Sequence, residues 1–306
     1  MDGTVKVWRL DAMQARSLTQ QHDGGIHAVA MTTTGKLVAT AGQDHVIRLW
    51  DFSTAQVTRT LKAHHDTVSC LSMASATGRM VSGSHDGSLI VWDLTQSEPL
   101  QIYDGRGGQG AITISFDGKK AVSGSLDGDL ILLDLEQGCL LRQWEAHRRN
   151  INFVAVTPDW HFIISGSSDG TLKVWNSDTF NCVLTLNAHH DGVTAGTLAE
   201  DGTILLSGGA DGTVRIWSFP SGNLLRTVSL HTAKIRTLQI VRDQQFVVSG
   251  GYDRCLKVWS LSDGKPVATF VIDAAVMAAA SDRTGKITVV GDALGCAHFL
   301  SLENLN

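Results

Sequence analysis

Proline, clusters of basic residues and long apolar stretches are all scarce in this sequence. Only 4 of the 306 residues are proline, whereas 31 are glycine and 43% are apolar, which favours short strands joined by glycine turns over a disordered chain. The longest apolar run, AAVMAAA at 274–280, is too short to cross a bilayer, so we expect no membrane insertion. The net charge of −5, without a dense basic run, gives no sign of nucleic-acid binding.

Cysteine is also sparse, and its spacing argues against disulfides. The five cysteines are isolated, odd in number and without CxxC spacing: Cys70, Cys139, Cys182, Cys255 and Cys296. We therefore expect buried thiols in a reducing compartment, the cytoplasm or alternatively the nucleus, and neither a metal site nor a cofactor. We expect no signal peptide, because DGTVKVW at residues 2–8 already has the pattern of a strand.

What the sequence does contain is a repeat with a period of 41 or 42 residues. Its clearest marker is a tryptophan, replaced twice by leucine, at Trp8, Trp50, Trp92, Leu133, Trp175, Trp217, Trp259 and Leu300. Within one period, four short segments have strand patterns: 151–157, 162–167, 172–175 and 182–186. Asp-Gly pairs such as Asp86-Gly87 between these segments indicate tight hairpin turns. The period therefore predicts an all-β fold built from four-stranded units.

The repeat resembles the WD-repeat family. The residues that carry the resemblance are SDGTLKVWN, ADGTVRIWS, HDGSLIVWD and DHVIRLWD, each preceded by a His-containing loop such as AHHDTV or AHRRNI. One departure is that the customary Gly-His pair is here mostly Ala-His. The resemblance covers essentially the whole chain, and it implies a single domain over 1–306: a seven-bladed propeller of four-stranded antiparallel blades around a central channel.

The expected strand count exceeds what seven blades need by one. Strands at 2–8 and about 15–20, six full sets, and three strands near 276–302 make 29, and seven blades need 28. The family commonly closes its ring by pairing an N-terminal strand with the last three, which the strand at 15–20 would do. Residues 2–8 are then surplus, and they are expected to be the last strand of a preceding blade in a longer protein. The alternative is that 2–8 displaces CAHFLSL, at 296–302, from the closing blade.

Five periods carry the same four polar residues, at successive offsets of 18, 4 and 6. The sets are His22, Thr40, Asp44 and Trp50; His64, Ser82, Asp86 and Trp92; His147, Ser165, Asp169 and Trp175; His189, Ser207, Asp211 and Trp217; and His231, Ser249, Asp253 and Trp259. Ser, His and Asp together could suggest a hydrolase, but a catalytic triad occurs once per active site. We predict no enzyme. The resemblance implies instead a buried hydrogen-bonded chain from the indole through the hydroxyl and imidazole to the turn aspartate.

Two periods depart from this pattern. In the period that ends at Leu133, Gly105 stands at the histidine position, so both ends of the hydrogen-bonded chain are absent together, which leaves Ser123 and Asp127 fewer unpaired partners. We expect a softer blade there, held by apolar packing of 130–132. In the last period all four positions are altered, to Ile272, Val290, Leu294 and Leu300.

Function should lie on the propeller face that carries the histidine loops, which we call the His-loop face. Residues that flank the start of each innermost strand, or that precede a turn aspartate, are expected to line the channel mouth there. Basic and aromatic residues are frequent among them and are typical of binding hot spots. The candidate site for partner proteins or peptides, and in particular for an acidic peptide or loop, comprises His27, His85, Arg148, Arg149, Asn150, Asn152, Lys234, Arg236, Tyr252 and Arg254.

We therefore expect a non-catalytic protein-interaction scaffold. The alternative is a sensor propeller that holds a nucleotide-driven switch inactive. It rests on a weaker resemblance of the ending GDALGCAHFLSLENL to the C-terminal propellers of NACHT and apoptotic-protease-activating-factor-type signalling proteins. This chain contains no P-loop, so the switch of such a protein would lie outside it.

Overall fold

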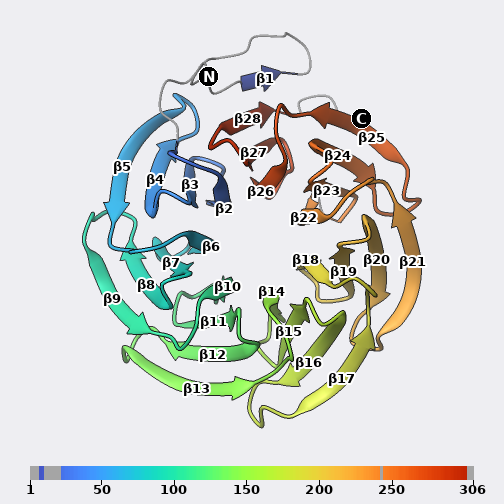
Figure 1. The fold of residues 1–306 in the computed structure, drawn as a ribbon, viewed down its shortest axis with the longest axis horizontal. Coiled ribbons are helices and arrows are strands. Elements are labelled where there is room, and N and C mark those ends of the chain that lie inside the picture. The colour runs from blue at the N-terminus through green and yellow to red at the C-terminus, as the bar shows by residue number, and fades with distance from the viewer. Residues whose placement is uncertain (1–6, 10–21, 242–243, 302–306) are drawn as a thin grey trace.

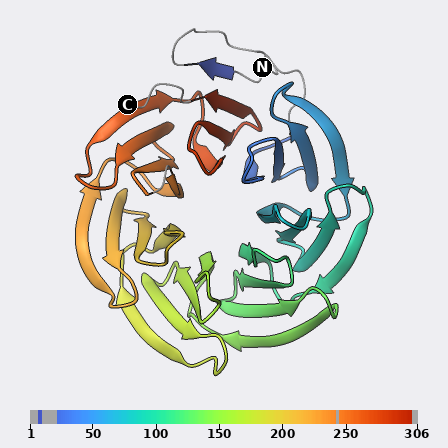
Figure 2. The same ribbon diagram turned by 180° about the vertical axis from the view of Figure 1, so that it is seen from behind.

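Seven four-stranded sheets stand around a central channel like the blades of a propeller (Figures 1 and 2). The computed structural model describes residues 7–9, 22–241 and 244–301. In these residues there are 28 strands, and no helix long and apolar enough to cross a membrane is found among them. The predicted all-β seven-bladed propeller is confirmed. We number the blades from the N-terminus as blade 1 (β2–β5) to blade 6 (β22–β25), followed by the closing blade.

Each blade begins at the channel and proceeds outward. The innermost strands are β2 (Ile26–Met31), β6 (Val68–Ala74), β10 (Gln109–Ile114), β14 (Ile151–Val156), β18 (Val193–Leu198), β22 (Ile235–Val241) and β26 (Val276–Ser281). The second strands are β3 (Leu37–Gly42), β7 (Arg79–Ser84), β11 (Lys120–Ser125), β15 (Phe162–Ser167), β19 (Ile204–Gly209), β23 (Phe246–Gly251) and β27 (Ile287–Asp292). Second strands are buried almost throughout, because adjacent blades cover both of their faces.

The outer half of each blade follows the same order. The third strands are β4 (Val46–Asp51), β8 (Ser88–Asp93), β12 (Asp129–Asp134), β16 (Thr171–Asn176), β20 (Thr213–Ser218), β24 (Cys255–Ser260) and β28 (Ala297–Ser301). The outermost strands are β5 (Gln56–Lys62), β9 (Pro99–Asp104), β13 (Cys139–Glu145), β17 (Cys182–Asn187), β21 (Asn223–Ser229), β25 (Pro266–Val271) and β1 (Val7–Arg9). Neighbouring strands are antiparallel throughout blades 1–6.

The closing blade differs from the strand pairing expected from the sequence. β1 pairs with β28 in parallel, with Trp8 opposite Leu300 in the register. β28 keeps the third place, so the alternative in which residues 2–8 displace this strand is wrong. The described part of this N-terminal region, Val7–Arg9, lies instead on the outside of β28. The strand expected at 15–20 lies outside the described residues.

The hydrophobic core is divided among the seven interfaces between adjacent blades. One cluster of buried residues, for example, joins Ala39 and Leu49 of blade 1 to Met80 and Trp92 of blade 2. Each of the other interfaces has a similar cluster. Because every blade needs both neighbours to cover its faces, the ring as a whole holds the core together.

Candidate functional site at the channel mouth

The four polar residues of each regular period are joined by hydrogen bonds inside blades 1, 2, 4, 5 and 6. The indole Nε1–H donates to the hydroxyl over 2.8–3.1 Å, and the hydroxyl lies 2.7–2.9 Å from the imidazole Nε2. In four blades Nδ1 lies 2.8–3.2 Å from the turn aspartate. In blade 2 the Ser88 hydroxyl stands between His64 Nδ1 and Asp86, at 2.8 and 2.6 Å. All five hydroxyls are completely buried, so none is open to a substrate.

Burial keeps these imidazoles neutral. It lowers the pKa of all five histidines below the ordinary value, and the neighbouring aspartates oppose that effect only in part. A neutral ring that donates its Nδ1–H to the carboxylate, or in blade 2 to the Ser88 hydroxyl, can accept a hydrogen bond from the buried hydroxyl at Nε2, so each of these polar groups has a partner. Burial would raise the pKa of Asp86, but hydrogen bonds from Ser88 and from the His65 backbone outweigh it and lower the pKa to about 2. The arrangement has the character of structural support and not of an activated nucleophile.

Blade 3, which lacks the tryptophan, contains a substitute that sequence reasoning missed. The Ser123 hydroxyl donates to Gln109 Oε1 at 2.7 Å, and Gln109 Nε2 donates to the carbonyl of Gly107 at 2.8 Å. A Cβ atom at Gly105 would come within 2.7 Å of Gln109 Nε2, so glycine there leaves room for the amide. The sequence showed that the indole and the imidazole are absent from this blade, but not that Gln109 takes the place of the imidazole. The available signal was a glutamine at a position where the other innermost strands begin with Ile or Val.

The closing blade also holds a polar pair outside the repeat. His298 Nε2 lies 2.9 Å from Asp292 Oδ2, and both residues are buried. The other carboxylate oxygen accepts hydrogen bonds from the backbone of Leu294 and Cys296. Three positions of the lost polar set are buried apolar residues, and Leu294 is exposed. Sequence reasoning missed this pair because neither residue falls on a position that the other periods use.

At the His-loop face, a β-bulge near the start of every innermost strand directs one residue toward the channel. In each of these strands the pairing register skips the second residue. We call these seven residues the bulge ring: His27, Ser69, Gly110, Asn152, Thr194, Arg236 and Met277. All of them line one cavity of about 200 Å³. Three predicted site residues, His27, Asn152 and Arg236, therefore meet in the channel.

Part of the bulge ring is occupied in joining neighbouring blades. Ser69 donates to the carbonyl of Gln109 in the next innermost strand. Asn152 donates to the carbonyl of Val193 at 2.8 Å, and the Thr194 hydroxyl donates to Ile235. These three side chains are therefore committed to holding the channel wall together.

The other polar members of the bulge ring have no such contact. Arg236 Nε is inaccessible to solvent and has no hydrogen-bond partner among the described residues. Burial lowers the pKa of Arg236, and Tyr252 opposes this. Burial, with Arg236 and His85 nearby, lowers the pKa of His27 to about 4. At the rim, Lys234 Nζ lies 5.9 Å from the centre of the Tyr252 ring.

The remaining predicted site residues lie elsewhere on the same face. Arg148, Arg149 and Asn150 are exposed in the loop before β14, and Arg254 is exposed in the turn before β24. Blade 5 lies between β14 and the β22 strand that carries Arg236. The structure thus divides the predicted set into a channel-mouth group around Arg236, a separate exposed group on the loop of blade 4, and the exposed Arg254 on blade 6.

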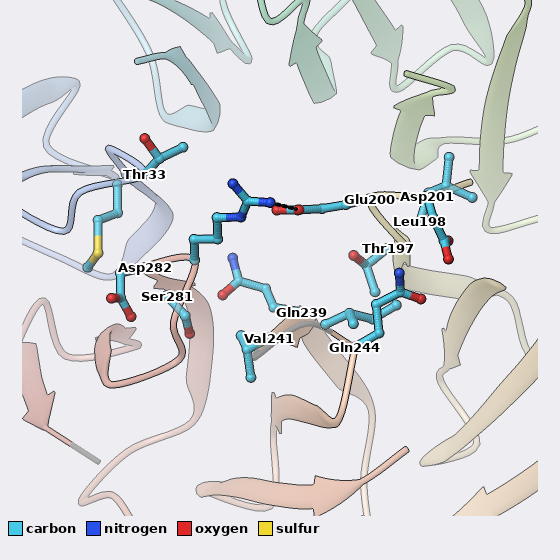
Figure 3. Close-up of a pocket in the computed structure, with 13 residues that line it drawn as sticks. Thr33, Thr197, Leu198, Glu200, Asp201, Gln239, Val241, Gln244, Ser281 and Asp282 are labelled. Carbon is cyan, nitrogen blue, oxygen red and sulfur yellow. Dashed lines mark ion pairs between the residues drawn. The ribbon is translucent and has the colours of Figure 1, made fainter. Parts of the chain in front are cut away.

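The opposite mouth of the channel has a different electrostatic character. A cavity of about 540 Å³ opens there among the turns that end the innermost strands (Figure 3). Arg283 Nη2 of the closing blade forms an ion pair with Glu200 Oε2 of blade 5, at 3.0 Å. Among the described residues, no group of three or more His, Cys, Asp or Glu side chains is placed to hold a metal ion. The arginine at this mouth is therefore compensated from within the chain, whereas Arg236 is not.

Comparison with known families agrees with the geometry of the blades. Residues 14–51 and 55–93 match the family described as WD domain, G-beta repeat. Residues 118–299, more than half of the chain, match the β-propeller family described as nucleolar protein 10-like, N-terminal domain. The chain belongs to the WD-repeat β-propellers. Its larger matched part belongs, within them, to the nucleolar protein 10-like N-terminal domain family.

Several WD-repeat relatives resemble parts of this propeller. A probable coatomer subunit beta' from Schizosaccharomyces pombe is 30% identical over 129 residues, 38% of this chain and 16% of the relative. A U3 small nucleolar RNA-associated protein 15 homolog from Bos taurus is 32% identical over 105 residues, 34% of this chain and 20% of the relative. Autophagy-related protein 16 from Arabidopsis thaliana is 27% identical over 108 residues, 33% of this chain and 21% of the relative. The matches span only about a fifth of each relative's length.

Proposed function

We propose that this WD-repeat propeller is a non-catalytic scaffold that binds partner proteins or peptides on the His-loop face. The proposal rests on a contrast between the polar groups inside the blades and those on the His-loop face. The repeated Ser, His and Asp side chains are bonded to one another inside the blades, which leaves no exposed reactive set in these repeats. The cations of the candidate site, by contrast, form no ion pair with any described carboxylate: Arg148, Arg149, Lys234, Arg236 and Arg254.

The chemistry of that face favours an acidic peptide or loop as the partner. Arg148, Arg149 and Arg254 are exposed, and Lys234 stands beside the exposed ring of Tyr252. Arginine and tyrosine supply much of the binding energy in protein interfaces. Cations that form no ion pair within the chain remain available to a negatively charged group of a partner.

The test compares the partners of two charge-reversed propellers. One carries Arg149→Glu and Lys234→Glu on the His-loop face. The matched control carries Lys36→Glu and Lys286→Glu, two exposed lysines in the turns of the opposite face. Affinity purification with quantitative mass spectrometry should show the wild-type partners depleted at least about tenfold for the first variant and retained by the control. The proposal is contradicted if the two variants retain the same partners.

No structural observation favours the alternative function, a sensor propeller of a larger switch protein. It rests on the resemblance of residues 291–305, of which 302–305 lie outside the described residues. The cellular compartment also stays a prediction. Relatives named for coatomer and for a small nucleolar RNA-associated protein suggest different compartments, so the cytoplasm and the nucleus both remain open.

A further inference from the structure

The bulge ring is asymmetric, and its asymmetry identifies a place for a ligand. On blades 2, 4 and 5 its side chains bond to the next innermost strand. On three consecutive blades, blade 6, the closing blade and blade 1, it presents Arg236, Met277 and His27 to the cavity. No hydrogen bond from a described residue reaches the side chain of Arg236 or His27. The unpartnered side chains thus share one sector of the channel mouth.

Arg236 is costly where it stands, and the fold does not require it. The residue is half-buried, and its Nε–H has lost its contact with water without gaining a hydrogen-bond partner among the described residues. The same bulge position on other blades is filled by serine, glycine or threonine, so the backbone geometry of the bulge needs no charge. An uncompensated guanidinium that faces a cavity and is not needed for the fold is best explained by an anion that enters from outside.

We propose that the bulge ring receives one carboxylate side chain of a partner, inserted into the channel mouth and held by the guanidinium of Arg236. This rests on the proposed function and names the anchor of that interface. A guanidinium offers a planar pair of N–H donors that matches the two oxygens of a carboxylate. The cavity of about 200 Å³ suits a single side chain and not a folded segment. Met277 supplies an apolar surface for the methylene groups of an entering glutamate.

The charge of the bulge ring favours a carboxylate over a phosphoryl group. Burial keeps the pKa of His27 at about 4, so its imidazole is neutral at pH 7 and Arg236 supplies the only positive charge of the ring. Lys234 lies outside the ring and stands at the Tyr252 side chain. A phosphoryl group carries a charge of about −1.5 to −2 at this pH. A carboxylate matches the single charge, whereas a phosphoryl group would leave part of its own charge uncompensated.

The first test uses small probes on the full chain and needs no known partner. N-acetylglutamate N-methylamide carries one carboxylate, its glutamine counterpart carries none, and the phosphoserine counterpart carries a phosphoryl group. The readout is the arginine Nε–H signals in NMR spectra of ¹⁵N-labelled protein, with Arg236 assigned by its loss in Arg236→Lys. The Arg236 signal should shift saturably as the glutamate probe is added. The affinity obtained in the same way for the glutamine probe should be at least about tenfold weaker. Equal shifts with both probes, or tighter binding of the phosphoserine probe, would overturn the proposal.

The second test separates a binding role of Arg236 from a structural one. Arg236→Met removes an uncompensated charge and should raise the midpoint of thermal unfolding. The glutamate probe should raise that midpoint in the wild type and leave it unchanged in Arg236→Met. A lower midpoint for Arg236→Met would show that the side chain supports the fold, and the proposal would be wrong.

The exposed arginines of blade 4 distinguish failure of this inference from failure of the proposed function. Arg148→Glu with Arg149→Glu leaves the bulge ring intact, so the glutamate probe should bind this variant as it binds the wild type. If the probe binds but charge reversal on the His-loop face leaves the partners unchanged, the carboxylate site stands and the proposed interface fails. If the partners depend on that face but the probe does not shift Arg236, the interface stands and this inference fails.

Discussion

At the scale of single residues, the blades satisfy the same buried hydroxyl in two ways. In five blades the hydroxyl receives an indole N–H and lies next to a neutral imidazole, as Ser165 does between Trp175 and His147. In blade 3 the amide of Gln109 takes the imidazole's place, and Leu133 fills the indole's position without a polar group. Losing indole and imidazole together is tolerable because no indole N–H is left behind without an acceptor.

The role of Gln109 leads to a prediction about stability. Gln109→Ala should lower the free energy of unfolding by about 1–3 kcal/mol, because the buried Ser123 hydroxyl is left with the carbonyl of Ala111 as its one remaining acceptor and the carbonyl of Gly107 loses its donor. Urea unfolding followed by tryptophan fluorescence measures this change. Gln137→Ala, at an exposed position of the same blade, is the matched control and should change stability by less than about 0.5 kcal/mol. Similar values for both variants would contradict the assigned role of Gln109.

At the scale of structural elements, the bulge in each innermost strand changes the direction in which the second residue of that strand points. In a regular strand the second residue would take its place in the register, whereas the bulge directs it into the channel. Thr194 uses this position to reach the carbonyl of Ile235, 41 residues away in the next blade. The bulge residues therefore act either as ties between blades or, at Arg236, as a candidate binding group.

A second prediction tests the ties between blades. Thr194→Val keeps the shape of the side chain but removes the hydroxyl that donates to Ile235 and contacts Gly208. Its free energy of unfolding should fall by about 1–2 kcal/mol, because a buried carbonyl loses its donor. Thr232→Val, on an exposed loop of blade 6, is the control and should be close to neutral. Equal effects of the two substitutions in urea unfolding would show that the hydroxyl of Thr194 does not join the blades.

At the scale of the whole molecule, the buried histidine that recurs in five blades should make the free energy of unfolding depend on pH. Five buried histidines have a pKa below the ordinary value in the folded chain. On unfolding, each returns to about 6.5 and takes up a proton more readily than it does in the folded state. Their contribution to stability is therefore complete above about pH 6.5 and decreases as the pH falls below that value.

The free energy of unfolding should accordingly fall between pH 7.5 and pH 5.5. Four turn aspartates add to the loss only at lower pH, because their pKa is depressed, to about 2 at Asp86: Asp44, Asp86, Asp169 and Asp211. Urea unfolding at several pH values measures the slope, and the proton uptake on unfolding in this range should exceed one. A stability that is constant or that increases as the pH falls to 5.5 would show that these histidines are already charged in the folded state.

Most of the fold was predictable because each blade is encoded within one stretch of sequence. The tryptophan period, the Asp-Gly turns and the fixed spacing from His147 to Trp175 all concern contacts within a single four-stranded unit. Such units bury their faces against neighbouring copies of themselves, and the resemblance to the WD-repeat family implies that seven of them close into a ring. The positions that line the channel mouth, Arg236 and His27 among them, were also predictable, because they recur at the same place in each period.

Features that depend on contacts between blades could not be predicted from the sequence, and only the three-dimensional structure defined them. The place of β1 outside β28, the buried pair of His298 and Asp292, and the separation of Arg149 from Arg236 are not expressed in any single period. The local pattern specifies which residues a blade buries, because neighbouring strands are joined by short turns. Which side chain at the channel mouth keeps a partner, and which is left with none, depends on distances across the ring that only the assembled propeller defines.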